Sequence, residues 1–283
     1  MIYIPFLGAL ALGTGTILER LLLKKKKIGI KLYQTASFLS IVLLMIPLLY
    51  FFWKFDSQAL ELKNILIFFG IIFVAVLANL FSLYSIQGEK VSITEPARIL
   101  EPLFVILLTM IFGIFIVGFR GTNTKIIIPA LIAGVAIVFP HLKKEHLKFN
   151  KYFVAALLGS LFFALELVLS KLILNFYSPI TFYFFRCLFV FAISFILFRP
   201  KLKSLDKKVS LKILLIAGVW IIYRVAVYFG YLNYGIIFTT LITMISPIVI
   251  YLLASKFLKE KLNWKNILSS VIIVACVIYA IID

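Results

Sequence analysis

Long apolar stretches follow one another along almost the whole chain, with short polar segments between them. About 20 apolar residues in a helix span the roughly 30 Å of hydrocarbon in a bilayer. Lipid offers backbone amides no partner, so each stretch is expected to be an α-helix. The sequence therefore predicts an all-α, polytopic membrane protein with about ten transmembrane helices. The expected spans are 2–22, 31–53, 64–85, 92–117, 124–141, 152–171, 179–198, 211–231, 236–256 and 265–282.

The composition excludes a water-soluble fold. Of the 283 residues, 64% are hydrophobic and 14% are charged. Soluble domains average about 45–50% apolar and about 25% charged residues. The ten expected spans leave no segment long enough for a separate soluble domain.

The net charge of +18 is concentrated in alternate loops. By sequence, 21 of the 29 lysines and arginines fall in the loops after the odd-numbered spans, and five fall in the other loops. Cytoplasmic loops carry the excess of basic residues, which predicts a multi-pass protein of the cytoplasmic membrane with both termini outside. The basic loops are expected to contact anionic lipid head groups. Nucleic acid is not an expected partner, since the chain has no soluble module with a basic face.

The two halves of the chain align with each other, as expected for a transporter built from repeats. Leu7-Gly8 in the first span matches Leu158-Gly159 in the sixth, and Pro102 matches Pro247. Each half contains five helices, an odd number, so the second half must be inverted in the membrane relative to the first. We therefore expect two inverted five-helix repeats, residues 1–141 and 142–283. In this register, Asn79 aligns with Arg224, Arg98 with Thr243, and Glu101 with Ser246.

Ionisable side chains within the spans mark the expected site, since a charge at the bilayer centre costs roughly 2.5–3.5 kcal/mol on insertion scales. In the fourth span, Glu95, Arg98 and Glu101 are spaced three apart and share one helix face. This face either lines a water-filled cavity or forms salt bridges that fix the helix against its neighbours. Pro102 and Pro247 are predicted helix breaks, because a proline leaves a backbone carbonyl without its helical partner.

Two further arginines, Arg186 and Arg224, lie near the centres of the seventh and eighth spans. They either capture a carboxylate or phosphate of the substrate or pair with Glu166 or Glu101. Glu19 and Arg20 lie near a helix end, and a topological role is expected for Arg20 and for Lys171. The nearly balanced charges favour a zwitterionic substrate. The candidate residues for substrate binding or gating are Glu95, Arg98, Glu101, Glu166, Arg186, Arg224, Asn79 and Tyr228.

Several segments resemble a known family. The run Thr240-Leu-Ile-Thr-Met-Ile-Ser-Pro247, followed by Lys259-Glu-Lys-Leu262, resembles the end of a half in the EamA-type, ten-helix branch of the drug/metabolite transporter superfamily. The segment from Tyr177 to Arg186 is similar to the seventh helix of that family. The chain departs from the pattern in the first half, where residues 112–118 lack the hinge glutamate that Glu260 supplies in the second. The resemblance implies a transporter.

We therefore expect a secondary transporter that moves a small polar or zwitterionic metabolite, such as an amino acid, by alternating access. The alternatives are a flippase or exporter for a lipid-linked or amphipathic substrate, and a non-transporting membrane scaffold. No enzyme is expected, and His141 and His146 are too few for a metal site. No cofactor is expected either. Transport energy would come from proton or ion coupling, with Glu101 or Glu166 as proton carriers, or from exchange.

Overall fold

The computed structural model describes residues 1–26, 28–88, 97–116, 119, 124–139, 150–258 and 264–282. Within these residues the fold is all-α. Eight helical segments are long and apolar enough to cross a membrane, and two shorter apolar helices accompany them. One of the eight, Ile236–Leu253, is divided by a turn into two helices. This confirms the polytopic membrane protein that the sequence predicts.

The helices follow the expected spans closely. Their bounds are α1 Tyr3–Lys26, α2 Ile30–Phe52, α3 Leu62–Gly88, α5 Glu101–Phe115, α6 Thr124–Val138, α7 Lys151–Ile173, α8 Pro179–Phe198, α9 Lys207–Asn233, α10 Ile236–Thr243, α11 Ser246–Leu258 and α12 Trp264–Ile282. Short 3₁₀ turns η1 (Ser57–Leu60) and η5 (Leu174–Phe176) follow α2 and α7. Asn150 caps α7 by accepting from two backbone amides, and Ser178 caps α8 by accepting from the Thr181 amide.

Two of the expected continuous spans are broken in the structure. The predicted helix 236–256 is divided by a turn at residues 244–245 into α10 and α11. In the predicted helix 92–117, residues 97–98 are helical, a turn follows at 99–100, and α5 begins at Glu101. Pro102 and Pro247 are the second residues of α5 and α11. A first turn tolerates proline because backbone N–H groups there have no helical acceptor, so the missing N–H of proline costs no hydrogen bond.

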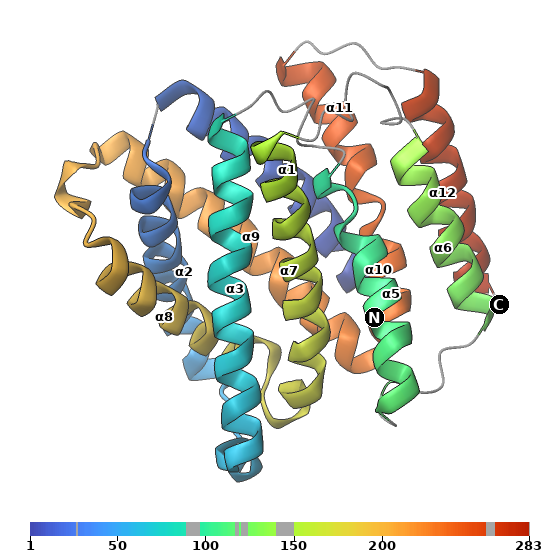
Figure 1. Cartoon of the computed structure of the whole chain (residues 1–283), viewed down its shortest axis with the longest axis horizontal. Helices are drawn as coiled ribbons and strands as arrows, with labels where there is room; N and C mark the ends of the chain where they lie inside the picture. Colours follow the sequence, from blue (N-terminus) through green and yellow to red (C-terminus); the bar gives the residue numbers. More distant parts are fainter. Residues whose placement is uncertain are drawn as a thin grey trace.

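Figure 1 shows how the helices are arranged. α2 packs against α8 at one edge of the bundle, and α6 packs against α12 at the opposite edge. Between them, α1 packs along α9 and α3 packs along α7. The broken helices α5 and α10–α11 lie between this central group and the α6–α12 pair.

Two loops are joined at one end of the bundle, which is at the bottom of Figure 1. Phe55, between α2 and η1, forms an antiparallel β-bridge with Tyr177, between η5 and α8. The Asp56 amide donates to the Phe176 carbonyl over 2.8 Å, and the Ser178 amide donates to the Lys54 carbonyl over 3.2 Å. We call residues 54–56 and 176–178 the interloop clasp.

Aromatic rings pack beneath the clasp. The ring of Tyr177 lies 5.5 Å from that of Phe55 and 5.5 Å from that of Phe182, centroid to centroid. Phe68 on α3 contacts both Tyr177 and Phe182. Such ring pairs add to the stability of the apolar contacts they make. The clasp and these rings together join the ends of α2, α3, α7 and α8.

Candidate functional site

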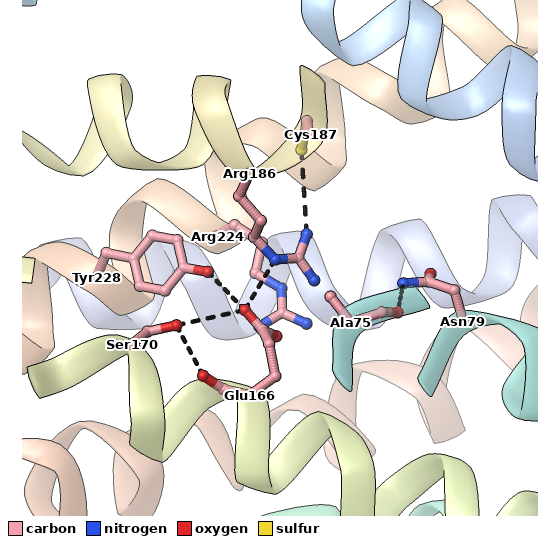
Figure 2. Close-up of polar contacts among 8 residues, drawn as sticks. All are labelled: Ala75, Asn79, Glu166, Ser170, Arg186, Cys187, Arg224 and Tyr228. Atoms are coloured by element: carbon pink, nitrogen blue, oxygen red, sulfur yellow. Dashed lines mark hydrogen bonds and ion pairs between the residues drawn. The ribbon is translucent and has the colours of Figure 1, made fainter. Parts of the chain in front are cut away.

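A buried carboxylate, that of Glu166 on α7, lies at the centre of the charged site (Figure 2). Its Oε1 atom accepts from Arg186 Nε over 2.8 Å and from the Tyr228 hydroxyl over 3.0 Å. Its Oε2 atom lies 3.1 Å from an Nη1 atom of Arg224. Because Arg186 is on α8 and Arg224 and Tyr228 are on α9, this one side chain connects three helices.

Burial makes these contacts strong. Glu166 is fully buried, and the Arg186 side chain is 2% exposed. Ser170 donates to the Glu166 backbone carbonyl over 2.7 Å, one helical turn away. The Arg224 guanidinium lies over the rings of Phe163 and Tyr223, at 5.6 and 5.4 Å from their centroids. Two guanidinium groups thus share one carboxylate, which leaves an excess positive charge in the bundle interior.

A cavity of about 120 Å³ adjoins this centre, and we call it the charged cavity. Arg186 and Arg224 lie on one of its walls, and Asn79 of α3 lies on another. Arg98 and Glu101, at the break before α5, also line it. Its remaining polar lining residues include Glu19, Tyr33, Gln34 and Ser37, from α1 and α2.

A second cavity, of about 100 Å³, lies beside the first, and we call it the hydroxyl cavity. Arg98, Glu101 and Tyr223 line both cavities. Pro102 and Pro247 line the hydroxyl cavity, so both helix breaks border it. The other polar groups of its wall are hydroxyls, those of Thr16, Ser82, Ser160, Tyr231, Thr240, Thr243 and Ser246.

The structure brings most of the predicted site residues together. Arg98, Glu101, Arg224 and Asn79 line the charged cavity, while Glu166 lies behind its arginine wall. Pairing with Glu166 was one of the two roles expected for Arg186 and Arg224, and both arginines make that pair. Glu101 lies within electrostatic reach of Arg224 and Arg98, but no described residue forms an ion pair with it.

Three of the predicted site residues do not contribute a side chain to the site in the expected way. Asn79 donates its side-chain amide back to the Ala75 carbonyl of its own helix over 2.7 Å, as Figure 2 shows. Tyr228 lines neither cavity and contacts Glu166 instead. Glu95 lies outside the described residues, and so does the hinge glutamate Glu260.

Sequence reasoning missed the wall formed by α1 and α2. Glu19 was placed near a helix end and not among the candidate site residues, yet it is 9% exposed and lines the charged cavity. Tyr33, Gln34 and Ser37 were not singled out. Their close spacing at the start of an apolar helix resembles an interfacial segment, although Gln34 and Tyr33 are each only 1% exposed. Polar residues that recur on one helix face would have been the available signal.

A third, apolar groove lies on the outside of the bundle. It has a volume of about 470 Å³ and is lined by side chains of α11 and α12, among them Ile248, Leu252 and Val271. It shares no lining residue with the charged or hydroxyl cavity. Among the described residues, no group of three or more His, Cys, Asp or Glu side chains could hold a metal ion.

Comparisons with known proteins agree with this architecture. Residues 150–282 match the model of the EamA-like transporter family. No curated protein matches the chain in sequence. The fold matches 28 chains of solved structures. One of them, titled only "Crystal structure of protein", has a TM-score of 0.72 and 14% sequence identity, over 99% of this chain and 96% of that chain. At this identity the likeness shows the fold alone.

Proposed function

We propose that the protein is a secondary transporter that moves a small polar or zwitterionic metabolite, such as an amino acid, across the cytoplasmic membrane by alternating access. The match of residues 150–282 to the EamA-like transporter family supports the transport role. The observation that carries this proposal is the charged cavity. Arg98, Arg186 and Arg224 line it, as do Glu19 and Glu101, and Glu166 lies directly behind it. Three arginines and three glutamates balance, and a neutral site with separated charges suits a ligand of the same kind.

We further infer that residues 1–141 and 142–283 are inverted repeats. Helix contacts that occur in matched pairs support this. α1 packs on α9 and α7 packs on α3, as the repeat requires if α1 corresponds to α7 and α3 to α9. The closest approaches correspond as well. A Cβ on Gly8 would lie 3.0 Å from Ala226 Cβ, and a Cβ on Gly159 would lie 3.0 Å from the Ser82 amide nitrogen.

The two helix breaks also fit the repeat. The turns at residues 99–100 and 244–245 occupy the same position under the alignment that matches Pro102 with Pro247. Broken helices at a repeat interface are a feature of secondary transporters, where they border the substrate site. Both breaks border the hydroxyl cavity, which supports a path for the substrate along this side of the bundle.

Alternating access requires each end of the substrate path to open and close in turn. The interloop clasp is suited to hold one end closed. It joins the loop after α2 to the loop after α7 through backbone hydrogen bonds. We propose that the clasp closes the extracytoplasmic end. The orientation rests on the loop charges: Lys201 and Lys203 between α8 and α9, and Lys207 and Lys208 at the start of α9, lie on the basic side, which is expected to be cytoplasmic.

Energy for transport would come from a proton or ion gradient or from exchange. Glu101 fits a proton carrier because it lines both cavities and forms no ion pair with a described residue. Glu166 is held by two arginines, which makes it the poorer candidate of the two.

The test is a thermal-shift screen of amino acids and related metabolites on purified protein, followed by counterflow uptake in proteoliposomes. We expect a zwitterion to raise the unfolding temperature and to be taken up, and both effects to be lost in Arg224→Ala and Glu101→Gln. Glu61→Gln, an exposed glutamate before α3, is the matched control. Uptake of a lipophilic cation but of no zwitterion would contradict the proposal.

A further inference from the structure

Oxygen atoms form the wall of the charged cavity that α1 and α2 contribute. Glu19 comes from the end of α1, and Tyr33, Gln34 and Ser37 come from the start of α2. Gln34 and Ser37 are three residues apart, and Tyr33 and Ser37 are four apart, so they share a face of α2. All four residues line the same cavity.

Two buried oxygen atoms of this wall, Gln34 Oε1 and the Tyr33 hydroxyl, lack a well-oriented hydrogen-bond partner within the described part of the protein. Gln34 donates its Nε2 to Ser194 Oγ over 2.9 Å, and its Oε1 is left without a partner. The Tyr33 hydroxyl lies within hydrogen-bonding reach of Glu19 and Ser37, although it is not well oriented towards either. The Glu19 carboxylate lies against the Tyr33 hydroxyl and forms no ion pair with any described residue. Buried polar groups are normally paired, so unpaired ones that face a cavity indicate a ligand.

The chemistry of the missing partner follows from these groups. A carboxylate and an amide oxygen only accept hydrogen bonds, and hydroxyls accept as well as donate. The partner must therefore donate hydrogen bonds or carry a positive charge, and only a positive charge also compensates the Glu19 carboxylate. Arg98 and Arg20 are within electrostatic reach of Glu19, but neither lies at ion-pair distance. Arg98 is also within reach of Glu101, so its charge is shared between two carboxylates.

We propose that Glu19, Tyr33, Gln34 and Ser37 form a subsite for a compact monovalent cation, which is the ammonium group of the transported substrate. An ammonium group has three N–H donors, and this wall offers acceptors for all three. Its charge would be neutralised by Glu19 in a site from which bulk water is largely excluded, where such a contact is strong.

The opposite pole of the substrate follows from the same cavity. Arg186 and Arg224 share the single carboxylate of Glu166, so their wall retains an excess positive charge that suits a substrate carboxylate. The substrate then lies with its carboxylate towards α8 and α9 and its ammonium towards α1 and α2. Its side chain would enter the adjoining hydroxyl cavity. The identification of the cation as the substrate's ammonium group and this placement of the carboxylate and side chain rest on the proposed transport of a zwitterion; the subsite for a compact monovalent cation does not.

The subsite is tested with simple cations on purified protein, without transport. Methylammonium chloride and sodium chloride are each compared with N-methyl-D-glucamine chloride at constant ionic strength, by thermal unfolding. We expect methylammonium to raise the unfolding temperature by about 2–4 °C. Glu19→Gln and Gln34→Met should abolish the rise, whereas the exposed controls Glu61→Gln and Gln58→Met should keep it.

Each other outcome is decisive. A rise with sodium that both cavity variants abolish would support the cation subsite but identify its occupant as a free alkali ion. No rise with either cation in the unmodified protein would overturn the subsite, and so would a rise that Glu19→Gln and Gln34→Met retain.

A second comparison separates this inference from the proposed function. Each amino acid that binds is compared with its desamino counterpart, which keeps the carboxylate. Glu19→Gln should weaken the binding of the amino acid by about tenfold or more and leave the binding of the desamino compound nearly unchanged. Equal weakening of the binding of both compounds would refute the subsite but would not contradict the proposed transport. If no amino acid binds, the proposed substrate class fails, and the methylammonium measurement still decides the subsite.

Discussion

The Nε atom of Arg186 donates to Oε1 of Glu166 over 2.8 Å, with both side chains buried. This contact joins α8 to α7 in the middle of the bundle. It also fixes the carboxylate, whose Oε2 then lies 3.1 Å from Arg224 on α9. Arg186 and Arg224, which line the charged cavity, are therefore positioned by Glu166, which does not line it.

Removing the charge of Glu166 should destabilise the protein strongly. In Glu166→Gln, two buried guanidinium groups lose their only described carboxylate partner. Loss of one member of a buried ion pair typically costs about 3–5 kcal/mol, and we expect a loss of this size in the free energy of unfolding in detergent. Ser170→Ala, which removes a hydrogen bond to the Glu166 backbone, is the control and should cost about 1 kcal/mol. Equal stability of the two variants would contradict the central role of Glu166.

Arg224→Lys should impair substrate binding more than it impairs folding. Lysine keeps the charge near Glu166 but loses the planar fork that holds a carboxylate by two hydrogen bonds. We expect uptake in proteoliposomes to fall about tenfold, mainly through a higher KM. Arg199→Lys, in the exposed loop after α8, should leave uptake unchanged. A fall in maximal rate with an unchanged KM would argue against contact between Arg224 and the substrate.

A disulfide across the interloop clasp should stop transport reversibly. Phe55 and Tyr177 form a pair flanked by backbone hydrogen bonds on both sides. In such a pair the Cα atoms lie about 4.5 Å apart, within the range that a disulfide spans. We expect Phe55→Cys/Tyr177→Cys, with both native cysteines replaced, to lose uptake on oxidation and regain it on reduction. Each single-cysteine variant is a control. Full uptake by the cross-linked protein would show that the clasp does not open during transport.

Gly230→Ala should strain the contact between α9 and α10. A Cβ at this position would lie 2.5 Å from Thr239 Cγ2 and 2.6 Å from Thr239 Oγ1. Overpacking of this kind costs about 1–3 kcal/mol, which thermal unfolding would detect. Thr239→Ala removes both clashing atoms, so the double variant should recover part of the lost stability. Gly70→Ala on α3, where a Cβ would meet no atom within 4 Å, is the control. Additive losses in the double variant would contradict the clash.

The membrane spans could be predicted from the sequence because lipid selects for long apolar runs, and that signal needs no knowledge of the neighbouring helices. The pairing of Glu166 with Arg186 could not, because it depends on how α7 and α8 are rotated against each other. Helix α9 is apolar on most of its surface, so its sequence does not indicate which face carries Arg224 inward. The alignment of Pro102 with Pro247 indicated two related breaks. It did not indicate that the turns precede the prolines by two to three residues.

The α1–α2 wall was missed for a related reason. Glu19 and Gln34 lie near the ends of their helices, where polar residues usually face the head groups. Their burial results from the packing of α1 against α9 and of α2 against α8, which involves segments far apart in the chain. The polar residues that recur on one face of α2 mark that face as distinct, but one sequence does not show which helices pack against it.

The interloop clasp has a consequence for how freely this end of the protein can vary among sequences. Its two hydrogen bonds join backbone amides to backbone carbonyls and use no side-chain atom. Most substitutions at residues 54–56, 176 and 177 would therefore preserve the bridge, and a proline at position 56 or 178 would remove a donor. Ser178 is less free, because its hydroxyl donates to the Phe52 carbonyl over 2.6 Å and caps α8. Related chains with quite different residues in these loops could retain the same closure, while the charged residues beneath it have no comparable freedom.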